Sequence, residues 1–184
     1  MAHASQITSK IKTITMLNND ITLYQVNNSN KKDHIELFNI EKAMYESFLK
    51  CLFPKEIYDY LSYFLDIETI KDKMIFDNHT FYLIKLKEKT AGFFEYELIP
   101  NAIIILNIFL LKENRNNKIG SFCFDFLKNE AKNKGINKIY APIYKDNKTA
   151  KEFFKYLGFH KHEEKAKYLG SDIYIFEDIF EYDI

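Results

Sequence analysis

Three apolar, β-rich segments follow one another in the middle of the chain. They span residues 80–86, 91–99 and 102–111 and are separated only by short polar turns. Short turns between such segments are typical of antiparallel strands joined in sequence. Segment 102–111 is almost wholly apolar, which predicts a central strand covered on both faces.

The last third of the chain changes to a helical period. Apolar residues recur at i, i+3, i+4, i+7 and i+8 from Ile119, and Gly135 stands where a left-handed cap would end the helix. A second helix is expected to begin at Asp146 or Asn147 and to end at Gly158. Strands are expected over 138–144, 159–167 and 172–180.

The first third is predicted to hold a hairpin, a strand and three helices. The hairpin would pair 11–16 with 21–26, and alternating apolar residues at Ile35 and Leu37 predict a strand over 34–40. The three helices are expected at 41–52, 54–64 and 66–74. We therefore expect a mixed α/β fold, with an N-terminal extension over 1–33 and a single domain over 34–184.

Composition excludes several classes of protein. The chain has 184 residues, and its 26 Lys+Arg balance its 26 Asp+Glu. A balanced charge argues against an overall basic field for nucleic acid. The longest apolar run is far below the roughly 20 residues of a membrane span, and the N-terminus lacks a signal-peptide pattern. Two distant cysteines give no disulfide framework. We therefore expect a reduced, cytoplasmic protein with neither a nucleic-acid nor a membrane partner.

The segment from Leu110 to Gly120 is the most informative for chemistry. An apolar strand runs through a polar loop into the N-terminus of a helix, where unpaired N–H groups and the helix dipole favour anions. Gly120 would let a ligand approach the backbone, and Arg115 and Lys118 would add positive charge. The alternative is an ordinary polar turn with solvated basic side chains.

Two motifs in this region resemble those of the GCN5-related N-acetyltransferase (GNAT) superfamily. Residues 115–120 (RNNKIG) resemble its pyrophosphate loop, and residues 147–159 (NKTAKEFFKYLGF) resemble its second signature. The predicted order of strands and helices is also the family's order. The resemblance implies a mostly antiparallel sheet with splayed strands. It also implies transfer of an acetyl group from acetyl-CoA to a primary amine of a small molecule or peptide, by direct attack in a ternary complex.

The resemblance also implies a cofactor site without a metal. A bulge in the strand before the loop, near Phe109, Leu110 and Leu111, would bring backbone amides to the pantetheine arm and the thioester oxygen. Strand 138–144 would diverge beside it. Asn147 and Phe154 would complete the pantetheine site. The loop amides that would cradle the pyrophosphate belong to Arg115, Asn116, Asn117, Lys118, Ile119, Gly120 and Ser121.

Two residues depart from the family pattern. Lys118 stands where the first glycine is common, and we expect it to need an ordinary φ. Phe154 stands where many members carry a tyrosine that protonates the leaving thiolate, and phenylalanine has no proton to give. Tyr156 is retained as a candidate acid, although it lies about 200° further around the helix, where a partly exposed aromatic is expected.

The general base is left open between Glu95 and Glu97, which share one face of their predicted strand. Asn107 interrupts the apolar strand and is expected to be satisfied by a neighbour. The acceptor pocket is expected between two groups of residues. These are Tyr58, Tyr60, Tyr63 and Phe64 on one side and Tyr174, Glu177 and Asp178 on the other.

His160 and His162 share a strand face, but without an evident third ligand no metal is expected. The main alternative function is a non-catalytic acyl-CoA-binding or regulatory module, which Phe154 and the lack of an obvious base favour. A homodimer is possible because open sheet edges often pair.

Overall fold

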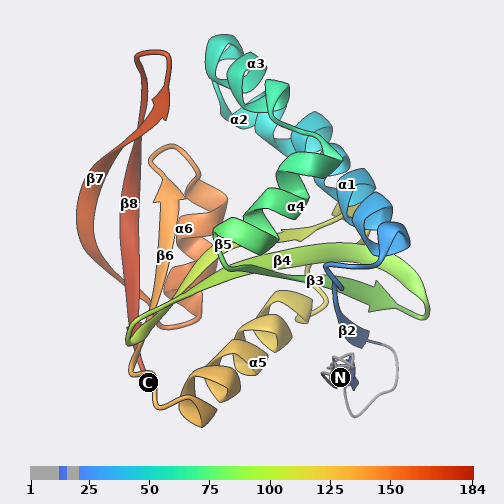
Figure 1. Ribbon diagram of the computed structural model, residues 1–184. Coiled ribbons are helices and arrows are strands. Elements are labelled where there is room, and N and C mark those ends of the chain that lie inside the picture. The colour runs from blue at the N-terminus through green and yellow to red at the C-terminus, as the bar shows by residue number, and fades with distance from the viewer. Residues whose placement is uncertain (1–12, 16–20) are drawn as a thin grey trace, which may run out of the picture.

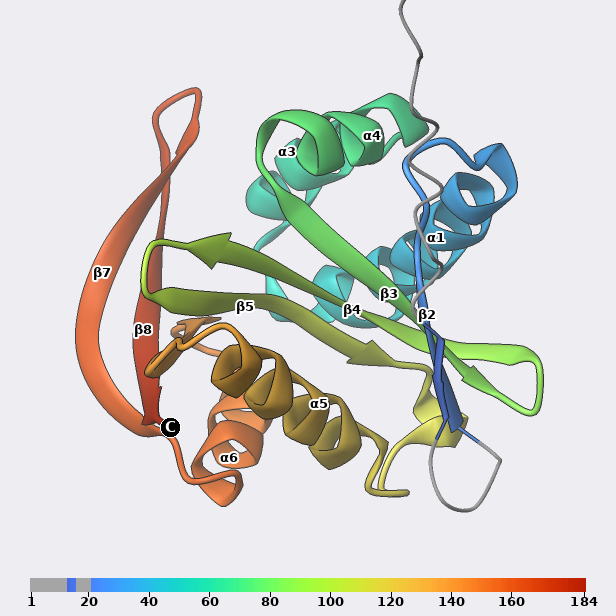
Figure 2. The ribbon, with the colours of Figure 1, turned by 60° about the horizontal axis from the view of Figure 1, so that its bottom comes forward.

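A computed structural model describes residues 13–15 and 21–184, and shows one mixed sheet of eight strands with helices on both faces (Figures 1 and 2). The strand order is β1-β2-β3-β4-β5-β6-β8-β7. The expected mixed α/β fold is confirmed. The strands are β1 (Thr13–Thr15), β2 (Ile21–Gln25), β3 (His79–Leu86), β4 (Lys89–Ile99), β5 (Ala102–Leu110), β6 (Lys138–Tyr144), β7 (His160–Gly170) and β8 (Ile173–Asp183).

The helices form two layers. One face of the sheet carries α1 (Lys31–Met44), α3 (Lys55–Tyr63) and α4 (Ile67–Phe76), while α5 (Ile119–Asn133) and α6 (Lys148–Tyr156) cover the other (Figure 2). Each layer encloses its own apolar core against the sheet. The short elements are a π-helical turn η1 (Tyr45–Leu49), α2 (Lys50–Leu52) and a 3-10 turn η2 (Lys112–Asn114). No helix in the described ranges is long and apolar enough to cross a membrane.

The prediction of a strand over 34–40 is wrong, because these residues belong to α1. Asn30 caps this helix by accepting a hydrogen bond from the N–H of Lys32. Leu37, Ile40 and Met44 are buried at helical spacing, whereas Ile35 is 40% exposed. The alternate apolar residues Ile35 and Leu37 suggested a strand. In the helix, however, Ile35 lies on the surface and only Leu37 belongs to the core.

The predicted meander is confirmed: β3, β4 and β5 pair antiparallel in sequence. The predicted ends of α5 and α6 are also confirmed, since Gly135 and Gly158 take positive φ and Asn147 caps α6. In the N-terminal region, β1 pairs antiparallel with β2, whereas the segment that joins the two strands of the expected hairpin lies outside the described residues. Because β2 also pairs with β3, it belongs to the main sheet. The division at residue 33 stays a prediction.

The sheet opens between β5 and β6. These parallel strands pair only from Ala102–Lys138 to Ile104–Tyr140, and then separate. Beyond that point β6 pairs with β8 alone, and Pro142 lies opposite Ile179 there. Proline lacks an N–H and suits a strand with one unpaired edge. The expected divergence of these two strands is therefore present.

Candidate functional site

A cavity of about 480 Å³ lies where β5 leaves β6. Its walls come from η1, the second half of β5, the loop into α5, and α6. The residues that line it are Phe48, Ile108, Phe109, Leu110, Arg115, Asn116, Lys118, Ile119, Gly120, Ser121, Asn147, Thr149, Ala150, Phe153, Phe154 and Tyr156. Of the predicted cofactor residues, only Leu111 and Asn117 are not in this lining. The sequence reasoning missed Phe48, Ile108, Thr149, Ala150 and Phe153.

The N-terminus of α5 opens into this cavity without a side-chain cap. Side chains cap α1, α4 and α6, whereas α3 begins at Pro54 without a side-chain cap and away from this cavity. The first N–H groups of a helix have no partner within it, so those of Ile119, Gly120 and Ser121 are available to an anion. The first bond of the helix runs from the N–H of Phe122 to the carbonyl of Lys118.

The loop before α5 contains two residues in the left-handed region. Asn116 has φ +64° and Lys118 has φ +57°. The expected ordinary φ at Lys118 is therefore wrong: the lysine adopts the conformation that a glycine would take there. A non-glycine residue in this region costs about 1–2 kcal/mol. The turn thus keeps the glycine-like geometry while placing a lysine at the cavity.

Arg115 is tethered at the entrance of the cavity. Its Nε donates a 3.0 Å hydrogen bond to the carbonyl of Leu110. Its guanidinium carbon lies 6.0 Å from the ring centre of Phe48 and 5.9 Å from that of Phe109. These contacts hold the charge beside the N-terminus of α5 and leave the terminal nitrogens for a ligand. No sequence pattern indicated Phe48, which lies in η1.

Gly120 lets helices α5 and α6 pack closely. A Cβ atom at this position would lie 2.8 Å from the ring of Phe153 on α6. The expectation that Gly120 also lets a ligand approach the backbone stays a prediction. Its missing side chain lets α6 approach α5, and this contact places Phe153 in the cavity wall.

The expected strand bulge is displaced. The irregularity of β5 lies opposite Glu95 and Tyr96, where Leu106 has no partner, and not at residues 109–111. The N–H of Leu111 donates to the carbonyl of Ala91, so it is not free. Because ladder bonds alternate along a strand, Phe109 also directs its backbone groups to β4, whereas Ile108 and Leu110 direct theirs to the open edge.

Helix α6 contributes three of the predicted residues. The side chain of Asn147 accepts a 3.1 Å hydrogen bond from the N–H of Ala150, which is its capping role. Phe154 is buried, with its ring packed edge-on against Phe153 and Phe159. Tyr156 is 76% exposed, as expected, and yet it lines the cavity. It is therefore the phenol that α6 brings to this site.

Glu95 lies in the sheet beneath α1 and α4 and is only 2% exposed. His79 Nδ1 lies 2.7 Å from its Oε1, and Asn107 Nδ2 donates to its Oε2 at 2.5 Å. Burial by itself raises the pKa of Glu95, but His79, Lys73 and Asn107 outweigh it and hold this pKa below its usual value. Asn107 is thus satisfied by a neighbour, as expected. Glu97 is half-buried and has none of these bonds.

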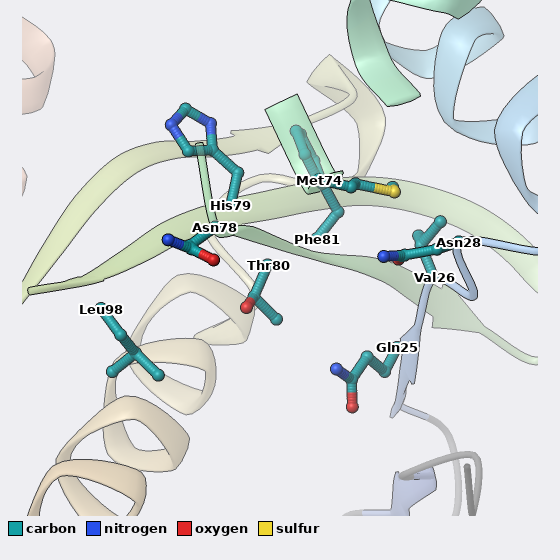
Figure 3. Close-up of a pocket in the computed structure, with 9 residues that line it drawn as sticks. All are labelled: Gln25, Val26, Asn28, Met74, Asn78, His79, Thr80, Phe81 and Leu98. Atoms are coloured by element: carbon teal, nitrogen blue, oxygen red, sulfur yellow. The ribbon is translucent and has the colours of Figure 1, made fainter. Parts of the chain in front are cut away.

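A second cavity of about 390 Å³ reaches His79 (Figure 3). Figure 3 shows His79, Met74 and Phe81 on one side of the strand and Thr80 and Gln25 on the other. The lining of this second cavity holds neither a lysine nor an arginine, and no helix begins there, so the cavity does not suit a polyphosphate. It does connect the His79–Glu95 pair with solvent.

The expected acceptor pocket is brought together only in part. The hydroxyl of Tyr60 on α3 donates to the carbonyl of Leu169 at the tip of the β7–β8 hairpin, at 2.6 Å. Asp178, in contrast, pairs with Lys151 of α6 and with Lys161. In this structure, therefore, the Asp178 carboxylate is engaged by two lysines and not by a residue of α3.

Comparison with known proteins now decides the family. The model of the "Acetyltransferase (GNAT) family" matches residues 36–159. The chain belongs to the GNAT acetyltransferase family. The resemblance found in the two motifs is confirmed, and the match spans both of them.

Individual relatives are distant in sequence. The chain is 21% identical over 151 residues to an "Uncharacterized N-acetyltransferase in pepI 3'region" of Lactobacillus delbrueckii subsp. lactis, covering 77% of this chain and 87% of that protein. The PaiA N-acetyltransferase of Thermoplasma acidophilum in complex with coenzyme A is 17% identical, with a TM-score of 0.70 over 89% of this chain and 99% of that one. The microcin C7 self-immunity acetyltransferase MccE, in complex with acetyl-CoA and AMP, is 19% identical, with a TM-score of 0.65 over 91% and 94%. At these identities the structures show a shared GNAT fold.

Proposed function

We propose that this protein transfers the acetyl group of acetyl-CoA to a primary amine of a small molecule or peptide. The observation that carries the proposal is the uncapped N-terminus of α5 at the cavity where β5 and β6 separate. Two of the similar structures contain coenzyme A or acetyl-CoA, and both share this fold. The residues present fit this co-substrate: basic side chains and free N–H groups suit the pyrophosphate, and an apolar slot suits the pantetheine arm.

Binding is assigned to two parts of the cavity. The N–H groups of Ile119, Gly120 and Ser121, with Arg115 and Lys118, hold the pyrophosphate. The open edge of β5 offers the N–H groups of Ile108 and Leu110 to the amide oxygens of the pantetheine arm and to the carbonyl oxygen of the thioester. A preorganised N–H donor in a site shielded from water stabilises the negative charge that develops on a thioester oxygen under attack.

The reaction forms a carbon–nitrogen bond and breaks the carbon–sulfur bond in one ternary complex. The attacking ammonium must first lose a proton, and we assign its acceptance to Glu95, acting through water. Its lowered pKa keeps Glu95 ionised at neutral pH, so it is ready to accept. His79 then connects Glu95 with the second cavity and solvent. Cys123 is fully buried, which argues against a covalent acyl-enzyme on this thiol.

The leaving thiolate needs a proton, and Phe154 has none to give. Tyr156 lines the same cavity and is the proposed donor. Replacing Tyr156 by Phe removes the hydroxyl and keeps the ring. We expect kcat to fall while the affinity for acetyl-CoA is unchanged. Solvent protonation of the thiolate would instead leave kcat unaffected.

A specific observation favours a second candidate, a non-catalytic acyl-CoA-binding module. Phe154 is packed in an aromatic cluster, and Glu95 lies one strand away from the open edge of β5. The two functions share the binding site and differ only in turnover. A thiol-release assay with acetyl-CoA and a panel of small amines and peptides separates them. Release with any amine supports the transferase. Binding of acetyl-CoA without release on the whole panel supports the module.

A further inference from the structure

A cluster of histidines and carboxylates lies on β7 and β8, outside the cavity assigned to acetyl-CoA. His160, Glu181 and Asp183 each place one ligand atom so that all three atoms lie within 4.8 Å of one another. His160 is directly opposite Glu181 in the β7–β8 ladder, and Asp183 is two residues further on the same face of β8. The sequence showed the two histidines but not the carboxylates, which come from the other strand of the hairpin.

A β-bulge brings the second histidine to the same place. Lys161 lies opposite Phe180 and Glu163 lies opposite Ile179, so His162 is the extra residue between them. Its Nδ1 lies 3.6 Å from Oε2 of Glu181. Bulges commonly re-aim a side chain at a functional position. Here the bulge adds a second imidazole on the other oxygen of the same carboxylate.

Glu181 is the buried centre of this cluster. It is 5% exposed, and its Oε2 has no hydrogen-bond partner among the described residues. A buried carboxylate oxygen without a donor is unfavourable. The imidazole of His162 lies on the side of Oε2, the imidazole of His160 lies on the side of Oε1, and the Tyr140 hydroxyl of β6 also interacts with this carboxylate. Imidazole and carboxylate groups occur together as ligands of zinc.

Lys138 of β6 is the cation that stands at the cluster in this structure. It contacts Glu181 and lies 3.4 Å from Asp183 Oδ1. Its side chain is 42% exposed, so it can turn outward. His160 and Asp183 are also exposed, at 59% and 66% of their side chains. Ligand atoms around a tetrahedral zinc ion lie about 3.3 Å apart, so rotation of these exposed side chains is enough to close the site.

We propose that His160, Glu181 and Asp183, with His162 as a fourth ligand, form a binding site for a divalent transition metal ion of the zinc class. Imidazole and carboxylate ligands together suit zinc, and also cobalt as its spectroscopic substitute. The ion takes the place of the Lys138 ammonium between the carboxylates. It ties β7 to β8 on a face remote from the N-terminus of α5, so it serves stability rather than acetyl transfer.

The full chain is first dialysed against a chelator and then titrated with Zn²⁺. A parallel titration with Co²⁺ is monitored by visible absorption. We expect one saturable equivalent and the absorption band of a tetrahedral cobalt site. Asp183→Asn changes an exposed residue and is expected to fold; it should weaken Zn²⁺ binding by roughly tenfold or more. Glu163→Gln removes a neighbouring negative charge from β7 and should leave the affinity within roughly twofold.

Lys138→Met gives the sharpest outcome, because it removes the competing cation. Without metal it leaves Glu181 unpaired and should lower the thermal midpoint. Zn²⁺ should bind this variant more tightly than the wild type and should restore the midpoint. Equal affinities for wild type, Asp183→Asn and Glu163→Gln would overturn the proposal, as would an absence of saturable binding. A midpoint of Lys138→Met that Zn²⁺ does not raise would overturn it as well.

Discussion

The ring of Phe153 on α6 occupies the space that a side chain at Gly120 on α5 would need, with 2.8 Å from a Cβ there to the ring. Helices α5 and α6 are separated by β6 in the sequence, and they pack closely here because Gly120 has no side chain. This contact lies directly under the first turn of α5. The geometry of the proposed pyrophosphate site thus depends on the packing of α6.

Gly120→Ala tests this dependence. Alanine favours a helix by about 1 kcal/mol over glycine, but overpacking costs about 1–3 kcal/mol. We expect a lower free energy of unfolding and weaker binding of acetyl-CoA, measured by denaturant titration and calorimetry. Adding Phe153→Leu should recover much of both losses, with Phe153→Leu alone as the control. Purely additive effects in this double-mutant cycle would contradict the packing account.

Variants at Lys118 and Asn116 separate the effect of backbone strain from the effect of positive charge at the cavity. Both residues take positive φ in the same loop, so glycine at either position should raise the free energy of unfolding by about 1 kcal/mol. Only Lys118→Gly also removes a positive charge from the cavity. We therefore expect weaker binding of acetyl-CoA for Lys118→Gly and unchanged binding for Asn116→Gly. The same affinity loss in both variants would instead point to loop geometry.

Glu95 and Glu97 form a matched pair for the proposed base. They lie on the same strand and face, but only Glu95 is held by His79 and Asn107. Once an acceptor amine is found, Glu95→Gln should lower kcat by roughly 100- to 10,000-fold. Glu97→Gln should stay within roughly twofold. The reverse order would move the base to Glu97. Comparable losses in the two variants would argue against a single carboxylate base.

The raised pKa of Glu41 predicts that the free energy of unfolding depends on pH. Glu41 is buried in α1, 3.9 Å from Lys73, and burial raises its pKa from 4.5 to about 7 although Lys73 opposes the shift. A raised carboxyl pKa stabilises the fold below pH 4.5, and this contribution is lost as the pH rises through 7. The shift corresponds to about 3 kcal/mol. Glu41→Gln should lack this decline between pH 5 and 8 in denaturant titrations. An identical pH profile in wild type and variant would contradict it.

The sequence predicted local features well because each rests on neighbouring residues. Asn147 and Gly158 mark the ends of α6 through capping and a positive φ, and both signals lie within the helix itself. The motif at 115–120 likewise lies on one continuous segment. The error at 34–40 has the same origin, since two apolar residues at alternate positions cannot distinguish a strand from one turn of helix.

Features that depend on distant segments were not predictable. The partner of Gly120 is a residue of another helix, and Phe48 reaches the cavity from a π-helical turn. The bulge near Leu106 depends on the register of β4 against β5. The two carboxylates beside His160 come from the opposite strand of its hairpin. In each case the sequence gives the residue type, whereas the neighbour follows only from the tertiary fold.

The central claim is that the N-terminus of α5 and Arg115 hold the pyrophosphate of acetyl-CoA. The most direct test is a calorimetric titration of wild type, Arg115→Ala and the control Lys165→Ala with acetyl-CoA. Lys165 carries the same charge on the exposed strand β7. We predict saturable binding that is weakened by roughly tenfold or more in Arg115→Ala and unchanged in Lys165→Ala. No binding to the wild type, or equal binding by all three proteins, would contradict the account.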